Sequence, residues 1–197
     1  MIKSPSIIQR IFFIGMSVFL IWQTISTVTN LMKIESVPEW GLQLFAAFLF
    51  NLYITGIFAF AGFALPTEKL MPAKYFEIKS PKKVNFWFKK LKGEWFRNFL
   101  LKTVWRKKTA QKKFFDGTIS GIKHFEIQTQ KSEFGHLIPF VIITILCVYF
   151  AIRGFWWAVF FTTLINVIFN FYPILLQRHH RGRLARLKRI IILKQKK

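Results

Sequence analysis

Apolar residues along this chain gather in four long runs, which polar and basic stretches separate. The runs cover residues 7–31, 40–65, 136–152 and 154–176. A helix needs about 20 residues to cross the hydrocarbon of a bilayer, so the first, second and fourth runs are long enough to span it. The third is marginal, and we expect it either to include residues 134–136 or to thin the bilayer locally. The pattern predicts an all-α, polytopic membrane protein with four transmembrane helices.

The run at residues 7–31 has two interpretations. It follows a basic stretch, as the apolar part of a secretory signal does. Its apolar stretch is longer than a signal needs, however, and no clean small-x-small cleavage site follows it. We therefore interpret this run as a retained membrane anchor.

Basic residues predict the orientation of these spans. Residues 66–136 hold 17 Lys and Arg against 6 Asp and Glu, and residues 178–197 hold 9 Lys and Arg and no acid. Lys and Arg are enriched in cytoplasmic loops of membrane proteins. We therefore expect both termini, the loop 66–135 and the basic tail 177–197 to be cytoplasmic. The two short connections would then lie on the other side.

The loop contains one strongly patterned segment, FWFKKLKGEWFRNFLLKTVW, at residues 86–105. Aromatic and basic residues alternate there in a helical rhythm. This is typical of an interfacial helix, with aromatic rings at headgroup depth and basic side chains toward anionic lipid. The chain shows no internal repeat and no low-complexity linker, so we expect residues 1–197 to form a single membrane-embedded domain.

Composition narrows the function classes. The chain combines 53% hydrophobic residues with a net charge of +22, a combination that is rare in a soluble domain. A basic, aromatic-rich chain is also compatible with nucleic-acid binding. Here the charge lies beside the spans, where topology and anionic lipid explain it, so no nucleic-acid partner is expected. The single cysteine, Cys147, makes no intramolecular disulfide and is a poor nucleophile, because an apolar setting disfavours the thiolate.

Glu133 and His136 stand where the third run begins. Residues i and i+3 share a helix face, so the carboxylate and imidazole converge if the helix begins before Glu133. At a helix N-terminus the positive dipole end favours a neutral imidazole, the form that a general base needs. The same dipole, with Lys131 nearby, suits an anionic ligand. The alternative is a polar helix start at the interface, with His136 as a boundary residue.

The last run carries a polar stripe. Its members, spaced to follow one side of a helix into the basic tail, are Asn166, Asn170, Gln177 and Arg181. We expect Pro173 to loosen the helix between them. Intramembrane amides usually face a bundle interior, where one or two serve only to hold helices together. Arginines at the rim are suited to phosphate or carboxylate, although every span also needs such charges where it ends.

Two further features concern catalysis. Asp116 and Gly117 form a turn signal in the loop upstream of Glu133. The chain has four histidines, which is too few for a membrane desaturase, and it lacks the second carboxylate–histidine pair of a di-iron site. We therefore expect no metal.

In these features the chain resembles the glycosyl-diaponeurosporenoate acyltransferase family, small bacterial membrane proteins of staphyloxanthin-type carotenoid pathways. The likeness covers roughly residues 65–190. It rests on an Asn and a Gln-Arg-x-x-Arg-x-Arg-Leu near the C-terminus, a Glu-x-x-His, an Asp-Gly and a Pro-x-Lys-Tyr-Phe. The matching residues are Asn170, Gln177, Arg178, Arg181, Arg183, Leu184, Glu133, His136, Asp116, Gly117, Pro72, Lys74, Tyr75 and Phe76. This sequence departs from the family in Pro173, which stands one place later, and in His179, His180 and Gly182, which replace Tyr, Asn and Pro.

The resemblance implies a bacterial inner-membrane acyltransferase. It would move a fatty acyl group from a thioester, such as an acyl-CoA, to a hydroxyl of a lipid-linked acceptor, without a cofactor. His136 would be the general base, Glu133 would orient it, and Asp116 would compete for the base role. Asn170 and Gln177 would hydrogen-bond the acceptor or the oxyanion. The donor phosphates would bind Arg178, Arg181 and Arg183.

Other function classes are left open by the sequence. A non-enzymatic membrane scaffold or partner subunit would use the amide stripe for helix packing and the basic tail for lipid or a partner. A membrane partner or a second copy of the chain is compatible with either function. A transporter element is a weaker alternative, because no charge lies deep in a span.

Overall fold

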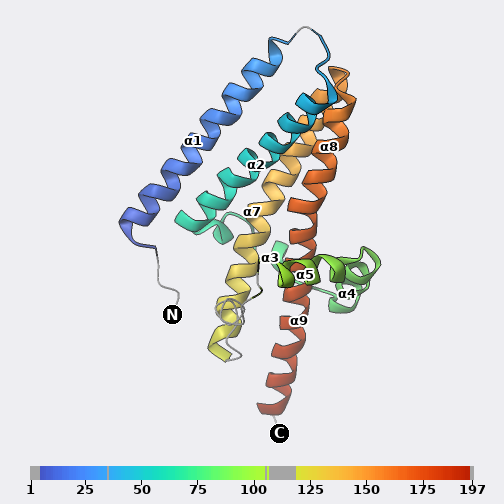
Figure 1. Cartoon of the computed structure of the whole chain (residues 1–197). Coiled ribbons are helices and arrows are strands. Elements are labelled where there is room, and N and C mark those ends of the chain that lie inside the picture. The colour runs from blue at the N-terminus through green and yellow to red at the C-terminus, as the bar shows by residue number, and fades with distance from the viewer. Residues whose placement is uncertain (1–4, 35, 105, 107–118, 196–197) are drawn as a thin grey trace. The chain divides into compact units, whose positions relative to one another are not determined.

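The computed structural model describes residues 5–34, 36–104, 106 and 119–195 (Figure 1). Every regular element in these ranges is a helix. In chain order they are α1 (Ile7–Met32), α2 (Trp40–Ala64), the 3-10 turn η1 (Thr67–Lys69), α3 (Ala73–Phe76), α4 (Pro81–Lys90), α5 (Gly93–Lys102), α7 (Ile119–Ile152), α8 (Trp156–Asn166), the π-helical turn η2 (Val167–Phe171) and α9 (Tyr172–Gln195).

Within the described residues, four helical stretches are long and apolar enough to cross a membrane. They are Ile7–Met32, Trp40–Ala64, Gly121–Ile152 and Trp156–Arg189. Most of their side chains are not buried inside the protein, as expected of helices that face lipid. The prediction of an all-α protein with four potential spans is confirmed.

The described chain divides into two compact units. The first unit comprises Lys3–Thr67 and Phe134–Phe171, and the second comprises Glu68–Glu133 and Tyr172–Lys197. The long helix α7 supplies its first part to the second unit and its remainder to the first unit. The single membrane-embedded domain stays a prediction.

The first unit is a set of long helices in which α1 lies along α2 (Figure 1). Helix α1 starts at a capping box, in which Gln9 N–H donates to Ser6 Oγ at 3.2 Å and Ser6 N–H to Gln9 Oε1 at 3.0 Å. Ser17 ties α1 to α2 through a 3.0 Å hydrogen bond from Oγ to the Ile57 carbonyl. An apolar core forms farther along, where the buried rings of Phe50 and Phe150 lie 5.6 Å apart.

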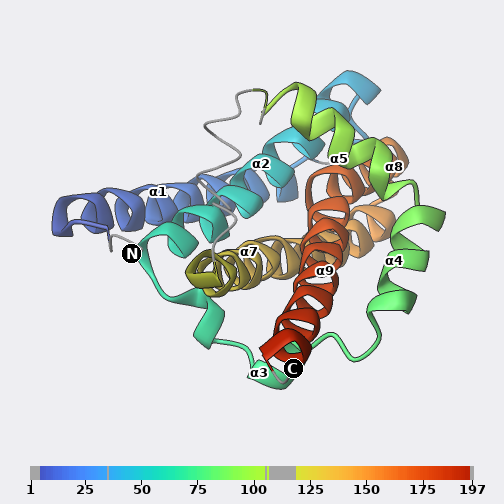
Figure 2. The same ribbon diagram turned by 90° about the horizontal axis from the view of Figure 1, so that it is seen from below.

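The second unit packs α4 and α5 against α9 (Figure 2). We expected one helix over residues 86–105, but the structure has two, separated at Lys92, whose φ of 54° is left-handed. A Cβ at Gly93 would lie 2.5 Å from the Phe88 ring, so glycine lets the two helices fold closely around that ring. Phe88 and Phe96 are buried against Leu176 of α9.

Helix α7 begins earlier than the apolar pattern predicts. It starts at Ile119 instead of residue 136, so Glu133 lies about four turns inside the helix. The dipole effect of a helix terminus is confined to the first turn, so it does not act on Glu133 or His136. The polar stretch stays helical because residues such as Thr129 are buried and hydrogen-bonded in the second unit.

Candidate functional site

His136 belongs to a network of amides and hydroxyls in the first unit, which we call the amide network. Its members are His136, Thr55, Thr144, Asn166, Asn170 and the carbonyl of Phe140. His136 Nδ1 lies 3.1 Å from Asn170 Oδ1. Asn170 Nδ2 in turn donates to Thr55 Oγ1 and to Asn166 Oδ1, each at 3.0 Å. A histidine in an apolar helix is thus held by a neutral partner.

The network ends on the backbone of α7. Asn166 Nδ2 donates to the Phe140 carbonyl at 3.1 Å and to Thr144 Oγ1 at 3.3 Å. Asn166 is 2% exposed and Asn170 is fully buried, whereas His136 is only partly buried. The Nδ1 side of the imidazole is therefore fixed by the network.

The π-helical turn η2 presents a partner of this histidine. Asn170, which faces His136, lies in the turn. Pro173 lies four residues after Phe169 and has no N–H, so it cannot donate to the Phe169 carbonyl. This missing hydrogen bond favours a departure from regular α-helix. Such π-turns are frequent at functional sites.

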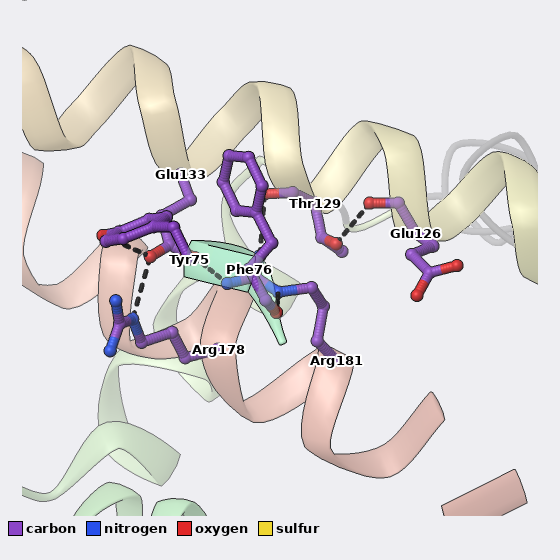
Figure 3. Close-up of polar contacts among 7 residues, drawn as sticks. All are labelled: Tyr75, Phe76, Glu126, Thr129, Glu133, Arg178 and Arg181. Carbon is purple, nitrogen blue, oxygen red and sulfur yellow. Dashed lines mark hydrogen bonds and ion pairs between the residues drawn. The ribbon is translucent and has the colours of Figure 1, made fainter. Parts of the chain in front are cut away.

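Glu133 lies at the centre of a second polar group, which we call the carboxylate–arginine cluster (Figure 3). Its carboxylate is completely buried. Oε1 accepts hydrogen bonds from Arg178 Nε at 2.8 Å and from the Tyr75 hydroxyl at 3.0 Å, and Oε2 accepts one from Arg181 Nη2. This cluster lies entirely in the second unit and joins α3, α7 and α9.

Arg181 is the buried cation of the cluster. Its side chain is 3% exposed, and each of its three nitrogens has an acceptor. Nε donates to the Phe76 carbonyl at 3.2 Å, Nη1 to the Thr129 carbonyl at 3.3 Å, and Nη2 to Glu133 (Figure 3). A guanidinium held in this way anchors α3 and α7 to α9.

Arg178 is placed differently. Its side chain is 40% exposed, and its guanidinium lies over the Tyr75 ring at 5.1 Å from the centroid. With one carboxylate and two guanidinium groups, the cluster carries a formal charge of +1. The exposed part of Arg178 is therefore suited to bind an additional anion.

The structure brings some of the predicted site residues together within each unit. It joins His136 to Asn170, and Glu133 to Arg178 and Arg181. Gln177 is partly buried and Arg183 is exposed on α9. Asp116 lies outside the described residues. Each oxygen of the Glu133 carboxylate has an arginine partner. The role of Glu133 in orienting His136 stays a prediction.

Sequence reasoning did not assign roles to several residues of these groups. Thr55 gave no signal, because a lone threonine in an apolar run usually bonds its own helix. Tyr75 and Phe76 were noted only as part of a Pro-x-Lys-Tyr-Phe pattern. The structure explains part of that pattern, since the Tyr75 hydroxyl donates to Glu133 and the Arg181 guanidinium lies 5.4 Å from the Phe76 ring centroid.

The chain matches the family model for glycosyl-4,4'-diaponeurosporenoate acyltransferase over residues 72–190. The chain belongs to this family. The matched range contains the whole carboxylate–arginine cluster and, apart from Thr55, the whole amide network. Searches of curated proteins and of solved structures gave no match. The family resemblance seen in the sequence is thereby confirmed.

Proposed function

We propose that this protein is a membrane acyltransferase that moves a fatty acyl group from a thioester donor to a hydroxyl of a lipid-linked acceptor. Membership of the glycosyl-4,4'-diaponeurosporenoate acyltransferase family supports acyl transfer as the reaction class. The observation that carries the proposal is His136, a partly buried histidine in an apolar helix with one nitrogen held by Asn170. Four helices long enough to span a membrane suit substrates that partition into lipid.

The reaction needs one base that later acts as an acid. His136 Nε2 takes the proton of the acceptor hydroxyl while the hydroxyl oxygen attacks the thioester carbonyl. The tetrahedral intermediate then collapses, and the carbon–sulfur bond breaks. The leaving thiolate takes the proton from the imidazolium, which gives an ester, a free thiol and neutral His136. No cofactor is consumed, because the thioester supplies the activated acyl group.

The remaining predicted residues have separate roles in this proposal. Arg178 and Arg183 bind donor phosphates if the donor is a coenzyme A ester, since both side chains are accessible. Arg181 supports the fold, because each of its nitrogens already has an acceptor within the protein. Gln177 binds the acceptor or the oxyanion. The acceptor would be a glycosylated carotenoid or another glycolipid.

The proposal includes the location of the protein. We place it in the bacterial inner membrane with both termini in the cytoplasm, because the Lys- and Arg-rich loop and tail would then face the cytoplasm. That orientation presents the basic residues to a cytoplasmic thioester donor.

A comparison of lipids tests this function. Cells expressing the wild type, His136→Ala or the control His124→Ala at matched membrane levels are extracted and examined by mass spectrometry. His124 lies on the same helix α7 but outside the amide network. We expect a lipid heavier by one fatty acyl group with the wild type and with His124→Ala only. Full formation of that lipid by His136→Ala would rule out the proposed base.

An absence of any new lipid with the wild type would favour a scaffold or partner subunit. Conservative substitutions distinguish the two functions further. A scaffold would tolerate His136→Gln and Arg178→Lys if both variants reach the membrane, whereas the enzyme requires the imidazole base.

A further inference from the structure

His136 has two nitrogens, and a base can use only the one without a proton. Which nitrogen carries the proton follows from the hydrogen-bond partners, provided that the orientation of the neighbouring amides is known. In the amide network that orientation is fixed by a backbone carbonyl, which can only accept.

The Phe140 carbonyl fixes the orientation of the first amide, that of Asn166. This carbonyl accepts from Asn166 at 3.1 Å, so the atom of the Asn166 amide that faces it is the nitrogen. Thr144 agrees with this, because its hydroxyl proton is used on the Phe140 carbonyl at 2.7 Å. Thr144 Oγ1 therefore accepts from the same Asn166 nitrogen at 3.3 Å. The oxygen of Asn166 must then face Asn170.

Asn170 is oriented by the same rule. Its nitrogen donates to the Asn166 oxygen at 3.0 Å, because two oxygens facing each other would repel. Thr55 does not decide the orientation, since a hydroxyl can donate or accept. The oxygen of Asn170 is left to face His136 Nδ1 at 3.1 Å. Only a protonated Nδ1 can donate to it.

We propose that Asn170 is a positioning residue, which holds His136 as the Nδ1–H tautomer and leaves Nε2 unprotonated. The catalytic meaning of this inference rests on the proposed function, in which Nε2 takes the acceptor proton. Asn170 differs here from its predicted role as a direct contact of substrate or oxyanion. It is fully buried, and its amide is used on His136, Thr55 and Asn166.

The π-helical turn gives this arrangement its geometry. Asn166 lies at the end of α8 and Asn170 lies within the turn, so their hydrogen bond spans the place where the regular helix is interrupted. The turn therefore sets the position of the Asn170 oxygen that faces His136 Nδ1.

Nitrogen-15 spectra test the tautomer directly. The full-length protein is labelled with 15N-histidine in detergent, and the His136 signals are found by subtracting the spectrum of His136→Gln, since the chain has four histidines. We expect protonated Nδ1 and unprotonated Nε2 in the wild type. Protonation of Nε2 in the wild type would overturn the inference without any need for a variant.

Two substitutions at Asn170 separate positioning from structure. Asn170→Leu removes the acceptor for Nδ1–H. Asn170→Asp keeps an oxygen acceptor for Nδ1–H and nearly the shape of the amide, although a protonated carboxyl donates one hydrogen bond where the Asn170 nitrogen donates two. Asn51→Leu is the matched control, because Asn51 is a buried amide of the same unit that bonds the Ala47 and Thr162 carbonyls instead of a histidine.

The rate is measured as transfer of the labelled palmitoyl group from palmitoyl-CoA to lipids of native membranes. We expect Asn170→Leu to lower kcat about 100-fold, the lower end of what general acid–base catalysis contributes, with an unchanged KM for the thioester. The Nδ1–H signal should be lost in Asn170→Leu and kept in Asn170→Asp and Asn51→Leu. Asn51→Leu should keep the wild-type rate, and Asn170→Asp should restore part of the rate that Asn170→Leu loses. A wild-type rate and tautomer in Asn170→Leu would contradict the positioning role.

Failure of the two proposals can be told apart. If the wild type shows Nδ1–H and loses it in Asn170→Leu but transfers no acyl group, the tautomer inference stands and the acyltransferase function fails. If acyl transfer needs His136 but Asn170→Leu is fully active, the function stands and the positioning role is wrong.

Discussion

The amide network and the carboxylate–arginine cluster both bury polar side chains, but they do so with opposite chemistry. The network around His136 is neutral, and its amides each donate and accept. The cluster around Glu133 joins one full negative charge to two positive charges. Desolvating a charge costs far more free energy than desolvating an amide, so the buried groups of the cluster, Glu133 and Arg181, depend on each other.

This contrast fits two different tasks. The neutral amides around His136 hold one tautomer of the proposed base without placing a charge beside it. An anchor between helices needs strong, directional contacts that do not change during the reaction. Arg181 is such an anchor, since its three nitrogens bind α3, α7 and Glu133. The following substitutions test whether the two groups differ in this way.

The largest effect is expected from Glu133→Leu. This variant leaves the buried guanidinium of Arg181 without its counter-charge, and breaking a buried ion pair on one side costs about 3–5 kcal/mol of unfolding free energy. Unfolding of the purified protein in detergent, followed by circular dichroism against denaturant, measures the loss.

The double variant Glu133→Leu, Arg181→Met is the control. It removes both charges together, and such replacements are often close to neutral. We therefore expect it to be more stable than the single variant. A single variant as stable as the wild type would show that Glu133 is not held in the charged cluster described above.

A smaller effect is expected from Asn166→Leu in the neutral network. Hydrogen bonds between helices in a membrane contribute about 0.6 kcal/mol on average and about 1.7 kcal/mol at most. The same unfolding measurement should give a loss in that range. If Asn166→Leu were as damaging as Glu133→Leu, the distinction between neutral and charged groups would not hold.

Much of the fold could be predicted from the sequence because it depends on length and hydrophobicity. Four apolar runs gave four helices able to span a membrane. The beginning of α7 at Ile119 could not be predicted in this way, because residues before Glu133 are polar. Their helix is stabilised by contacts such as Arg181 with the Thr129 carbonyl, which join residues far apart in the sequence.

Most of the residues that the sequence singled out lie in the two polar groups of the structure, but their pairing could not be predicted. Glu133 and His136 share a helix face by spacing, which suggested that they bind each other. The structure gives each of them partners from distant segments, Arg181 for the carboxylate and Asn170 for the imidazole. The π-helical turn adds to this, because it interrupts the regular spacing of the polar stripe after Asn166. Local sequence patterns do not predict such contacts between distant segments.

The smallest loss of stability is expected from Arg178→Met. Its side chain is 40% exposed, and Glu133 keeps the Tyr75 hydroxyl and Arg181 as donors in this variant, so unfolding should change little. Its effect on acyl transfer should be larger if the exposed guanidinium binds donor phosphate. We expect the KM for palmitoyl-CoA to rise while kcat is kept, because such contacts stabilise the bound donor and the transition state equally.

A donor without phosphates provides the control for this variant. With the N-acetylcysteamine thioester of palmitate, wild type and Arg178→Met should have the same KM, since neither can use a phosphate contact. An equal rise in KM for both thioesters would mean that Arg178 acts on the acyl chain or the fold instead of the phosphates. A large loss of stability in Arg178→Met would instead make it a second anchor of Glu133, equivalent to Arg181.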